Sequence, residues 1–415
     1  MATLARPAAL PLEVLDIGNP HLWTDYSHIL PYFAEMRRAG PVHWCAESMY
    51  GPYWNIVSHQ HIMEVEGRPD IFSSSWEKGG ITIADAPEGR ENEPKMPMFI
   101  AMDRPEHTGQ RRTVAPAFTP AEMVRQSGDI RRRTAELLDS LPVGEEFDWV
   151  DKVSIELTTG MLAILFDFPW ADRRLLTKWS DVATDFEAIE DEEKNNKRWE
   201  ILFEMVAYFT NLWNDRANKE PRPDLISMMI HSDATKNMTP QEYLGNLVLL
   251  IVGGNDTTRN TMSGAAMVQN LYRDNWQKMM ADPSLIQNGV SELIRWQTPL
   301  AHMRRTAPAD FEVGGQLIRA GEKVVMWYLS ANRDEALFPN ANVFDPTREN
   351  ARRHLAFGFG IHRCVGARLA ELQIGILLEE MQKRQMKVEI VGEPTRVYSS
   401  FVHGFRGLPV VMTRN

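Results

Sequence analysis

Apolar and polar residues recur along most of this chain with the spacing of amphipathic helices. Periodic segments bounded by proline, glycine or N-cap residues predict helices over 28–40, 60–66, 120–140, 147–168, 224–232 and 239–274, and two more within 171–218. Shorter segments rich in β-branched and aromatic residues predict strands at 42–45, 53–57 and 311–313 and within 387–413. We therefore expect a mainly α fold with small β-sheets, arranged as a single domain over residues 1–415 behind an irregular arm of about residues 1–28.

One long segment, residues 72–101, has no periodic pattern and is rich in serine, glycine and proline. Loops of this length inside a compact domain are usually functional or disordered. The segment is therefore either a functional loop or an ordinary mobile loop.

The expected helix over 239–274 is the longest, and it opens with Thr239 as N-cap and proline at its first position. Its centre reads Gly253-Gly254-Asn255-Asp256-Thr257-Thr258. Two glycines inside a helix cost about 1 kcal/mol each relative to alanine. Such a break in local preference is expected at a functional site. Small residues let a ligand approach the helix, and an acid beside a hydroxyl can relay protons.

Composition narrows the classes of protein further. With 415 residues, 43% of them hydrophobic, the chain can bury a large core, and its net charge of −11 argues against a general nucleic-acid binder. Two cysteines give no disulfide framework and indicate a reducing compartment. The longest apolar run, 247–254, is far shorter than the roughly twenty residues that span a bilayer. We expect a cytoplasmic protein without a membrane anchor or signal peptide.

The strongest chemical signal is the segment Phe357–Gly366, which holds three glycines and Cys364 just before an expected helix. Glycines let the backbone turn tightly and approach a flat ligand. A cysteine at a helix N-terminus is favoured as the thiolate, which is a good axial ligand for haem iron. The alternative is that Cys364 is only a small buried apolar residue.

The pattern Phe-Gly-x-Gly-x-His-x-Cys-x-Gly closely resembles the haem-binding loop of cytochromes P450, although His362 stands where many members have arginine. The centre of the long helix resembles the oxygen-activating groove of the same family, which more often has alanine at the position of Gly253. The resemblance implies the P450 fold, a helical prism enclosing haem b. It assigns Asp256 and Thr257 to proton delivery and Cys364 to the iron. The implied cofactor-binding residues are Cys364, His107, Arg111, Arg305, His362, Phe357, Gly358 and Gly366.

Two further details qualify this set. His107 and Arg111 lie four residues apart on one expected helix face, and Arg304 is the alternative to Arg305 by one residue. The family's structural ion-pair helix corresponds to Glu292 and Arg295, with Arg348 completing the network. A buried set of this kind predicts a brace for the fold and the haem loop rather than a catalyst.

The resemblance also implies the walls of a substrate pocket. They come from the unpatterned loop, the long helix, a chain return near 401 and the strand after 299, where Ala301 and Met303 would alternate on the pocket side. The residues are Met98, Phe99, Ile100, Leu249, Val252, Gly253, Ala301, Met303, Phe401 and Val402.

The function implied is that of a haem-thiolate monooxygenase, which inserts one oxygen atom of O2 into a C–H bond. Segments 99–103, 249–260 and 299–307 look particularly like the bacterial terminal hydroxylases of medium-chain alkanes and fatty acids. The alternatives are a P450 acting on a terpenoid or other cyclic hydrophobic substrate and a non-catalytic haem sensor.

The expected electron donor is a [2Fe-2S] ferredoxin with an NAD(P)H-dependent ferredoxin reductase. Basic residues around the haem loop, in an otherwise acidic chain, suit an acidic partner. They are Arg111, Arg112, Arg352, Arg353, Arg363 and Arg368.

Overall fold

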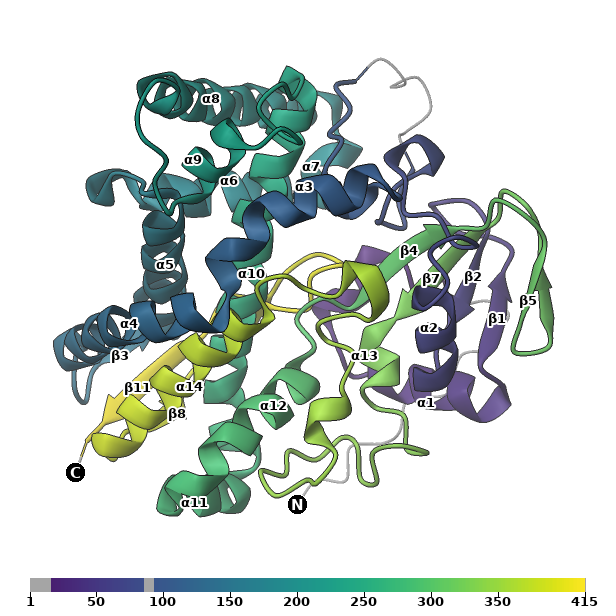
Figure 1. Ribbon diagram of the computed structural model, residues 1–415. Coiled ribbons are helices and arrows are strands. Elements are labelled where there is room, and N and C mark those ends of the chain that lie inside the picture. The colour runs from purple at the N-terminus through teal and green to yellow at the C-terminus, as the bar shows by residue number, and fades with distance from the viewer. Residues whose placement is uncertain (1–15, 86–92, 415) are drawn as a thin grey trace.

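A computed structural model describes residues 16–85 and 93–414. It shows a large helical body with a smaller sheet-rich region beside it (Figure 1). The helices are α1 (Ile29–Ala39), α2 (His59–Glu66), α3 (Glu106–Val114), α4 (Pro120–Ser140), α5 (Glu156–Phe166), α6 (Arg174–Ala183), α7 (Phe186–Glu190), α8 (Glu192–Arg216), α9 (Leu225–His231), α10 (Pro240–Leu271), α11 (Arg273–Ala281), α12 (Ile286–Gln297), α13 (Tyr328–Ala331) and α14 (Ala367–Lys383).

The strands form small sheets, as expected. They are β1 (Val42–Cys45), β2 (Tyr53–Ile56), β3 (Glu146–Asp148), β4 (His302–Thr306), β5 (Phe311–Val313), β6 (Gln316–Ile318), β7 (Lys323–Trp327), β8 (Lys387–Ile390), β9 (Thr395–Arg396), β10 (Phe405–Gly407) and β11 (Pro409–Thr413). The largest sheet has the order β1-β2-β7-β4, in which β2 and β7 run parallel. A second sheet has the order β3-β11-β8, and β5–β6 and β9–β10 form pairs.

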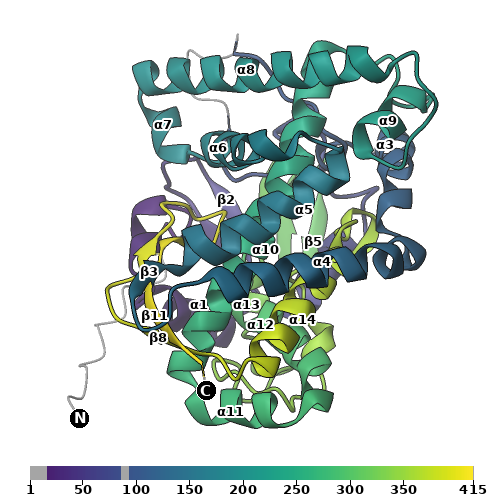
Figure 2. The ribbon, with the colours of Figure 1, turned by 90° about the vertical axis from the view of Figure 1, so that its left-hand side faces the viewer.

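The long helix α10 is the axis around which the body is built. It passes through the middle of the molecule, with α8 above it and α11 and α12 near its lower end (Figure 2). Helices α5, α6, α12 and α14 pack against it. Its N-terminus is a capping box: Glu242 N donates to Thr239 Oγ1 at 3.2 Å, and Thr239 N donates to Glu242 Oε2 at 2.8 Å. This reciprocal pair explains why the helix starts where the sequence predicts.

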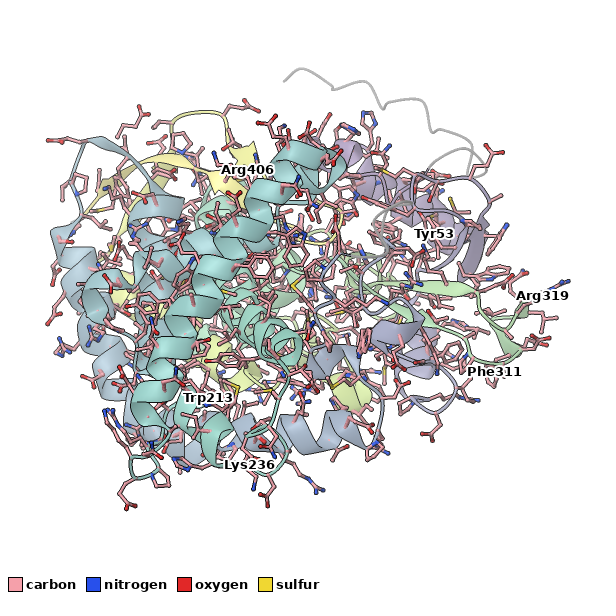
Figure 3. The ribbon with its side chains drawn as sticks, turned by 90° about the horizontal axis from the view of Figure 1, so that it is seen from above. Tyr53, Trp213, Lys236, Phe311, Arg319 and Arg406 are labelled. Atoms are coloured by element: carbon pink, nitrogen blue, oxygen red, sulfur yellow. The ribbon has the colours of Figure 1, made fainter. Side chains whose placement is uncertain are left out.

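Seen from above, α8 runs across the helical side of the molecule, with Trp213 near its C-terminal end (Figure 3). The β5–β6 hairpin, marked by Phe311 and Arg319, lies at the opposite edge. Helix α8 packs on α6 and α7, so these three helices form a layer over the N-terminal half of α10.

The N-terminal arm expected over 1–28 falls partly outside the described residues, which begin at residue 16. From there the chain is tied to the core rather than loose. Residues Pro20–Thr24 form a short 3-10 turn, and the fully buried ring of Trp23 stacks on Trp327 with centroids 5.8 Å apart.

Two expected helices differ from the structure because tertiary contacts override the local pattern. Residues 147 and 148 belong to β3, where Phe147 pairs with Val410, so the helix begins at Val150 with a π-helical stretch (Val150–Ile155) that continues as α5. Segment 171–218 holds three helices, α6, α7 and α8, where two were expected. The extra break falls at Asp185, before α7, and the second break lies at Asp191, before α8; the side chain of each aspartate caps the helix that follows it.

Candidate active site

A cavity of about 1110 Å³ lies between the centre of α10 and the segment leading into α14. Its lining includes Cys364 and most of the residues that the sequence assigns to cofactor and substrate. Most of the lining side chains are apolar, and Arg111, Arg305 and His362 are among those that carry a charge or an imidazole.

The Cys364 loop is folded back on itself. Cys364 N donates to Phe357 O at 2.8 Å, and Gly358 and Gly360 adopt left-handed backbone angles with φ of 66° and 65°. A Cβ on Gly360 would lie 2.4 Å from the Glu66 carbonyl oxygen, so only glycine fits there. The loop thereby presents the side chain of Cys364 to the cavity.

Burial within the protein raises the pKa of the Cys364 thiol, and the Gly366 N–H and the Arg111 and Arg363 guanidiniums act against that effect. The helix N-terminus alone therefore does not make Cys364 a thiolate, contrary to the sequence expectation. A cation beside the sulfur would reverse the balance, because a coordinating thiol is deprotonated.

Two arginines and a histidine, Arg111, Arg305 and His362, line the cavity beside this loop. His107 is buried behind them, with its ring centroid 4.3 Å from that of His362. Both ring nitrogens of His107 and Nδ1 of His362 lack hydrogen-bond partners among the described residues. Buried polar groups without partners, beside two cations, fit an anionic group that the protein must hold here. The two propionates of a haem are such groups.

Arg305 has a partner that the sequence analysis missed. Its Nη2 lies 3.2 Å from Oε1 of the fully buried Glu66, which also accepts a bond from Tyr328 OH at 2.7 Å. The other oxygen, Oε2, accepts from Phe359 N at 2.7 Å. Burial raises the pKa of the Glu66 carboxyl, and Arg305 opposes this. The carboxylate therefore links Arg305 to the Cys364 loop. The sequence feature that could have indicated this role is a glutamate at the end of α2, directly after its apolar residues.

On α10, the two predicted catalytic residues point in different directions. Thr257 faces the cavity and donates to Gly253 O at 2.9 Å. Asp256 is 1% exposed, and its carboxylate accepts from Ser180 Oγ at 2.9 Å and from Thr184 Oγ1 at 3.2 Å.

The charge of Asp256 is balanced from its own helix. Arg259 Nη2 lies 3.0 Å from Asp256 Oδ1, and Arg259 also pairs with Asp181 of α6 at 2.7 Å. Burial raises the pKa of the Asp256 carboxyl, while Arg259 lowers it. The acid thus stands at the edge of the cavity within a chain of hydroxyls and charged groups that reaches the half-exposed Asp181.

The two glycines of α10 have different surroundings. A Cβ on Gly253 would meet no atom within 4 Å, because this face of the helix borders the cavity. A Cβ on Gly254 would lie 2.7 Å from Leu162 Cδ2 of α5. One glycine therefore keeps space for a ligand and the other allows two helices to pack closely.

The expected ion-pair network forms away from the cavity. Arg295 Nε lies 2.7 Å from Glu292 Oε2, Arg348 Nε lies 3.0 Å from Glu292 Oε1, and Arg295 and Glu292 are fully buried. Arg295 and Arg348 also donate to backbone carbonyls of segment 332–343. Arg348 thereby joins Glu292 of α12, and Arg295 joins the helix to segment 332–343, which is the role of a brace.

Nine of the ten expected substrate residues line the cavity. Ala301 does not line it. Its N–H donates to Phe401 O at 2.8 Å and its carbonyl accepts from Leu329 N at 3.2 Å, so it packs with the buried cluster around Trp327. The alternation predicted for 301 and 303 fails because β4 begins only at His302, and Leu300 contacts the cavity instead.

A mainly helical fold with a cysteine facing a large cavity, opposite a glycine-interrupted helix, defines the class of haem-thiolate enzymes. Comparison with known proteins agrees. Residues 266–389 match the family model "Cytochrome P450". The chain is 34% identical to linalool 8-monooxygenase of Pseudomonas putida, over 97% of this chain and 99% of that protein. It is 30% identical to the methyl-branched lipid omega-hydroxylase of Mycobacterium bovis, over 97% and 96%.

Among solved structures, cytochrome P450-153 from Novosphingobium aromaticivorans is 58% identical, with a TM-score of 0.91 over 96% of this chain and 99% of that one. The chain belongs to the cytochrome P450 family. It is a monooxygenase, and the family's cofactor is haem b. Bacterial members receive electrons from separate redox proteins. None of the described helices combines the length and apolar character needed to cross a bilayer.

Proposed function

We propose that this P450 hydroxylates the terminal carbon of a medium-chain alkane or fatty acid. The observation that carries the proposal is a large, mainly apolar cavity that Cys364 lines. A chain substrate can lie along such a cavity with one end near the cysteine. The likeness of segments 99–103, 249–260 and 299–307 to alkane terminal hydroxylases, and an omega-hydroxylase among the relatives, support it.

Haem bound at this site would supply the oxidising chemistry that inserts oxygen into the C–H bond. Cys364 would ligate the iron. Arg111, Arg305, His107 and His362 would hold the propionates, and Phe357, Gly358 and Gly366 would border the ring. The two arginines would then neutralise the propionates inside the protein.

The residues of α10 would manage protons. Thr257, held by Gly253 O, offers its hydroxyl to the cavity, and Asp256 can exchange protons through Ser180 and Thr184. A carboxyl whose pKa is raised by burial passes a proton more readily than one held ionised. Dioxygen chemistry consumes protons, so this acid–alcohol pair also weighs against a non-catalytic haem sensor.

A terpenoid substrate is the second candidate, and linalool 8-monooxygenase among the relatives favours it. Terpenoid and straight-chain substrates are both apolar, so the lining admits either. Selectivity for a chain end requires a channel that admits only that end, because a terminal methyl has a stronger C–H bond than its neighbours.

For the redox partner we propose a [2Fe-2S] ferredoxin with its NAD(P)H-dependent reductase, all in the cytoplasm. Five of the six basic residues around the haem loop are exposed, namely Arg112, Arg352, Arg353, Arg363 and Arg368. An acidic partner docked there should transfer electrons more slowly as salt is added. Rates independent of salt would contradict docking by charge.

The direct test is product regiochemistry. Holoenzyme with a surrogate ferredoxin and reductase is given octane and dodecanoic acid, and mass spectrometry identifies the alcohols. Terminal alcohols are expected. Mostly internal alcohols, or turnover of a terpene but not of either chain, would overturn terminal hydroxylation. The Cys364→Ala variant should be inactive and lack the red-shifted Soret band of a thiolate-ligated carbon monoxide complex.

A further inference from the structure

One part of the cavity lining comes from a short turn in the loop before α3. Met98 and the 3-10 turn Phe99–Ala101 that follows it all line the cavity, and together they are called the loop wall below. Met98 is the N-cap of this turn, and its side chain accepts no hydrogen bond from the turn. The buried Phe99 N–H instead donates to Oδ1 of Asn246, on α10, at 3.1 Å. The start of the loop wall is therefore held by a residue of another element.

Asn246 is 2% exposed, and its side chain does not line the cavity. Its Nδ2 donates to Gln110 Oε1 of α3 at 2.8 Å and lies 3.2 Å from Met238 Sδ. With the amino group held on that side, the amide oxygen must face the other side, where Phe99 N lies. Both polar groups of the amide are in use, so its orientation is fixed.

The residue before Asn246 allows the loop to lie directly on α10. A Cβ on Gly245 would be 2.7 Å from the carbonyl carbon of Pro97 and 3.0 Å from that of Met96. A side chain at position 245 would therefore push the loop backbone away from the helix, whereas glycine permits the close approach. Gly245 and Asn246 together hold the loop from Pro97 to Phe99 against α10.

Asn246 also connects the loop wall to other parts of the site. Leu249 and Gly253, three and seven residues further along α10, share its side of the helix and line the cavity. Gln110 directly precedes Arg111, which the proposed function assigns to a haem propionate. The loop wall, the cavity-facing side of α10 and the helix α3 thus meet at one buried amide. A shift of the loop wall would change the space between it and α10.

The end of the loop wall has an anchor of its own. Asp103 Oδ1 accepts from Ser74 N at 2.9 Å, and Ala101 N donates to Met98 O within the turn at 2.8 Å. Loss of the Asn246 bond would therefore release the start of the loop wall while the segment after it stays attached. The expected consequence is a displaced cavity wall in a folded protein.

We propose that Asn246 is a positioning residue, which fixes the loop wall and thereby determines which carbon of a chain substrate reaches the reaction site. The inference rests on the proposed function in taking a chain molecule as the substrate of this cavity. It goes further in naming a residue outside the cavity that controls regiochemistry. A misplacement of about 1 Å at a reacting carbon is enough to lower its rate strongly.

The test compares Asn246→Leu with wild type, both as holoenzyme with a surrogate ferredoxin and reductase and with octane as substrate. Leucine is similar in shape to asparagine but accepts no hydrogen bond, so Phe99 N loses its partner. The ratio of the main wild-type alcohol to its isomers, measured by mass spectrometry, should fall at least about 5-fold. Amide hydrogen exchange in residues 97–102 should become at least about 10-fold faster.

Asn270→Leu is the matched control. Asn270 also lies on α10 and joins it to another segment, since its Nδ2 donates to Val388 O at 2.9 Å and its Oδ1 accepts from Ile390 N at 3.2 Å. Asn270 does not line the cavity and has no contact with the loop wall among these bonds. This variant should lose stability but keep the product ratio of wild type.

Two further variants separate position from stability. Asn246→Asp keeps an acceptor for Phe99 N, and its second oxygen can accept from Gln110 once that amide turns, so the product ratio should stay near that of wild type. Gly245→Ala displaces Pro97 while alanine favours the helix, so the product ratio should fall as in Asn246→Leu. The carbon monoxide spectrum verifies that each variant keeps its haem, and Gly245→Ala stands as the test if Asn246→Leu does not.

An unchanged product ratio in Asn246→Leu would overturn the inference, as would an equal fall in Asn270→Leu. These comparisons do not depend on which alcohol wild type makes. Internal alcohols from wild type, with the expected change in Asn246→Leu, would overturn only terminal hydroxylation. Terminal alcohols from both proteins in the same ratio would overturn only the role of Asn246. No product from octane or dodecanoic acid in wild type would overturn both.

Discussion

Single buried charges decide most of the chemistry around the cavity. Glu66 and Asp256 are each almost fully buried, and each has several hydrogen-bond donors on other elements and one arginine as counter-charge. A buried charge that loses its partner is costly, whereas the intact pair adds little net stability. The loss of one such group should therefore be visible in a single variant, and the two carboxylates should differ in what is lost.

Asp256→Asn should lower turnover at least about 100-fold, in the range typical of a lost general acid. The amide can keep bonds to Ser180 and Thr184 but cannot supply a proton. Because Arg259 keeps its ion pair with Asp181 in this variant, the free energy of unfolding at pH 7 should change by less than about 1 kcal/mol. Product formation and urea unfolding measure the two effects. Full turnover in the variant would remove Asp256 from proton delivery.

Glu66→Gln should instead act on stability. Glutamine can still accept from Phe359 N or Tyr328 OH, but it leaves Arg305 without its buried counter-charge. We expect the free energy of unfolding of the haem-free protein to fall by about 3 kcal/mol. Glu64→Gln, on the same helix but only loosely paired with Arg68 at 3.7 Å, is the control and should change it by under about 0.5 kcal/mol. Equal free energies of unfolding of the two variants in urea would show that the Glu66 network adds no stability.

At the level of elements, α10 combines a strong start with a weak centre. The capping box at Thr239 stabilises its N-terminus, while two glycines lower the helix propensity of its centre. The structure shows a different role for each glycine, since Gly253 borders the cavity and Gly254 contacts Leu162. A helix that holds both a ligand-facing surface and a close helix contact needs both positions to be small.

A matched pair of variants tests this division. Gly253→Ala gains about 1 kcal/mol of helix propensity without a clash, so the melting temperature should rise. Gly254→Ala gains the same propensity but forces Leu162 to move, which costs about 1–3 kcal/mol. Gly254→Ala should therefore be less stable than Gly253→Ala. Calorimetry measures the melting temperature of both variants. Equal values would show that Leu162 of α5 moves away from the new methyl group without cost.

The difference between local and long-range interactions explains which elements could be predicted from the sequence. The bounds of α4 and the start of α10 follow from N-caps and prolines, which act locally. The strand at Phe147 requires Val410, far along the chain, and no local pattern encodes that pairing. The position of Cys364 came from a long motif, whereas Glu66 matters through partners on distant elements. Ala301 was assigned to the pocket by alternation that starts one residue later.

Across the whole molecule, several histidines are buried in neutral form. His302 lies beside Trp327, His354 beside Phe357, and His403 against Tyr26. Burial lowers the pKa of His302 to about 4 and the pKa values of His354 and His403 to about 3. Unfolding releases each from burial, so the unfolded chain binds more protons than the folded one below about pH 6.5.

Stability should therefore fall as the pH is lowered from about 6.5 toward 4, and each of these histidines should account for about 2 kcal/mol of that loss at pH 5. The buried carboxyls of Glu66 and Asp256 act oppositely, because a raised pKa favours the folded state on acidification.

The contribution of one histidine is thus best isolated as a difference between proteins. His403→Gln keeps an amide donor near Gln297 O but cannot take up a proton, so its free energy of unfolding should fall by about 2 kcal/mol less than that of wild type between pH 7 and pH 5. Urea unfolding of the haem-free proteins at both pH values measures this, with His28→Gln, at a half-exposed position, as the control. Parallel losses in wild type and His403→Gln would mean that this imidazole is charged in the fold, and burial would not set its protonation.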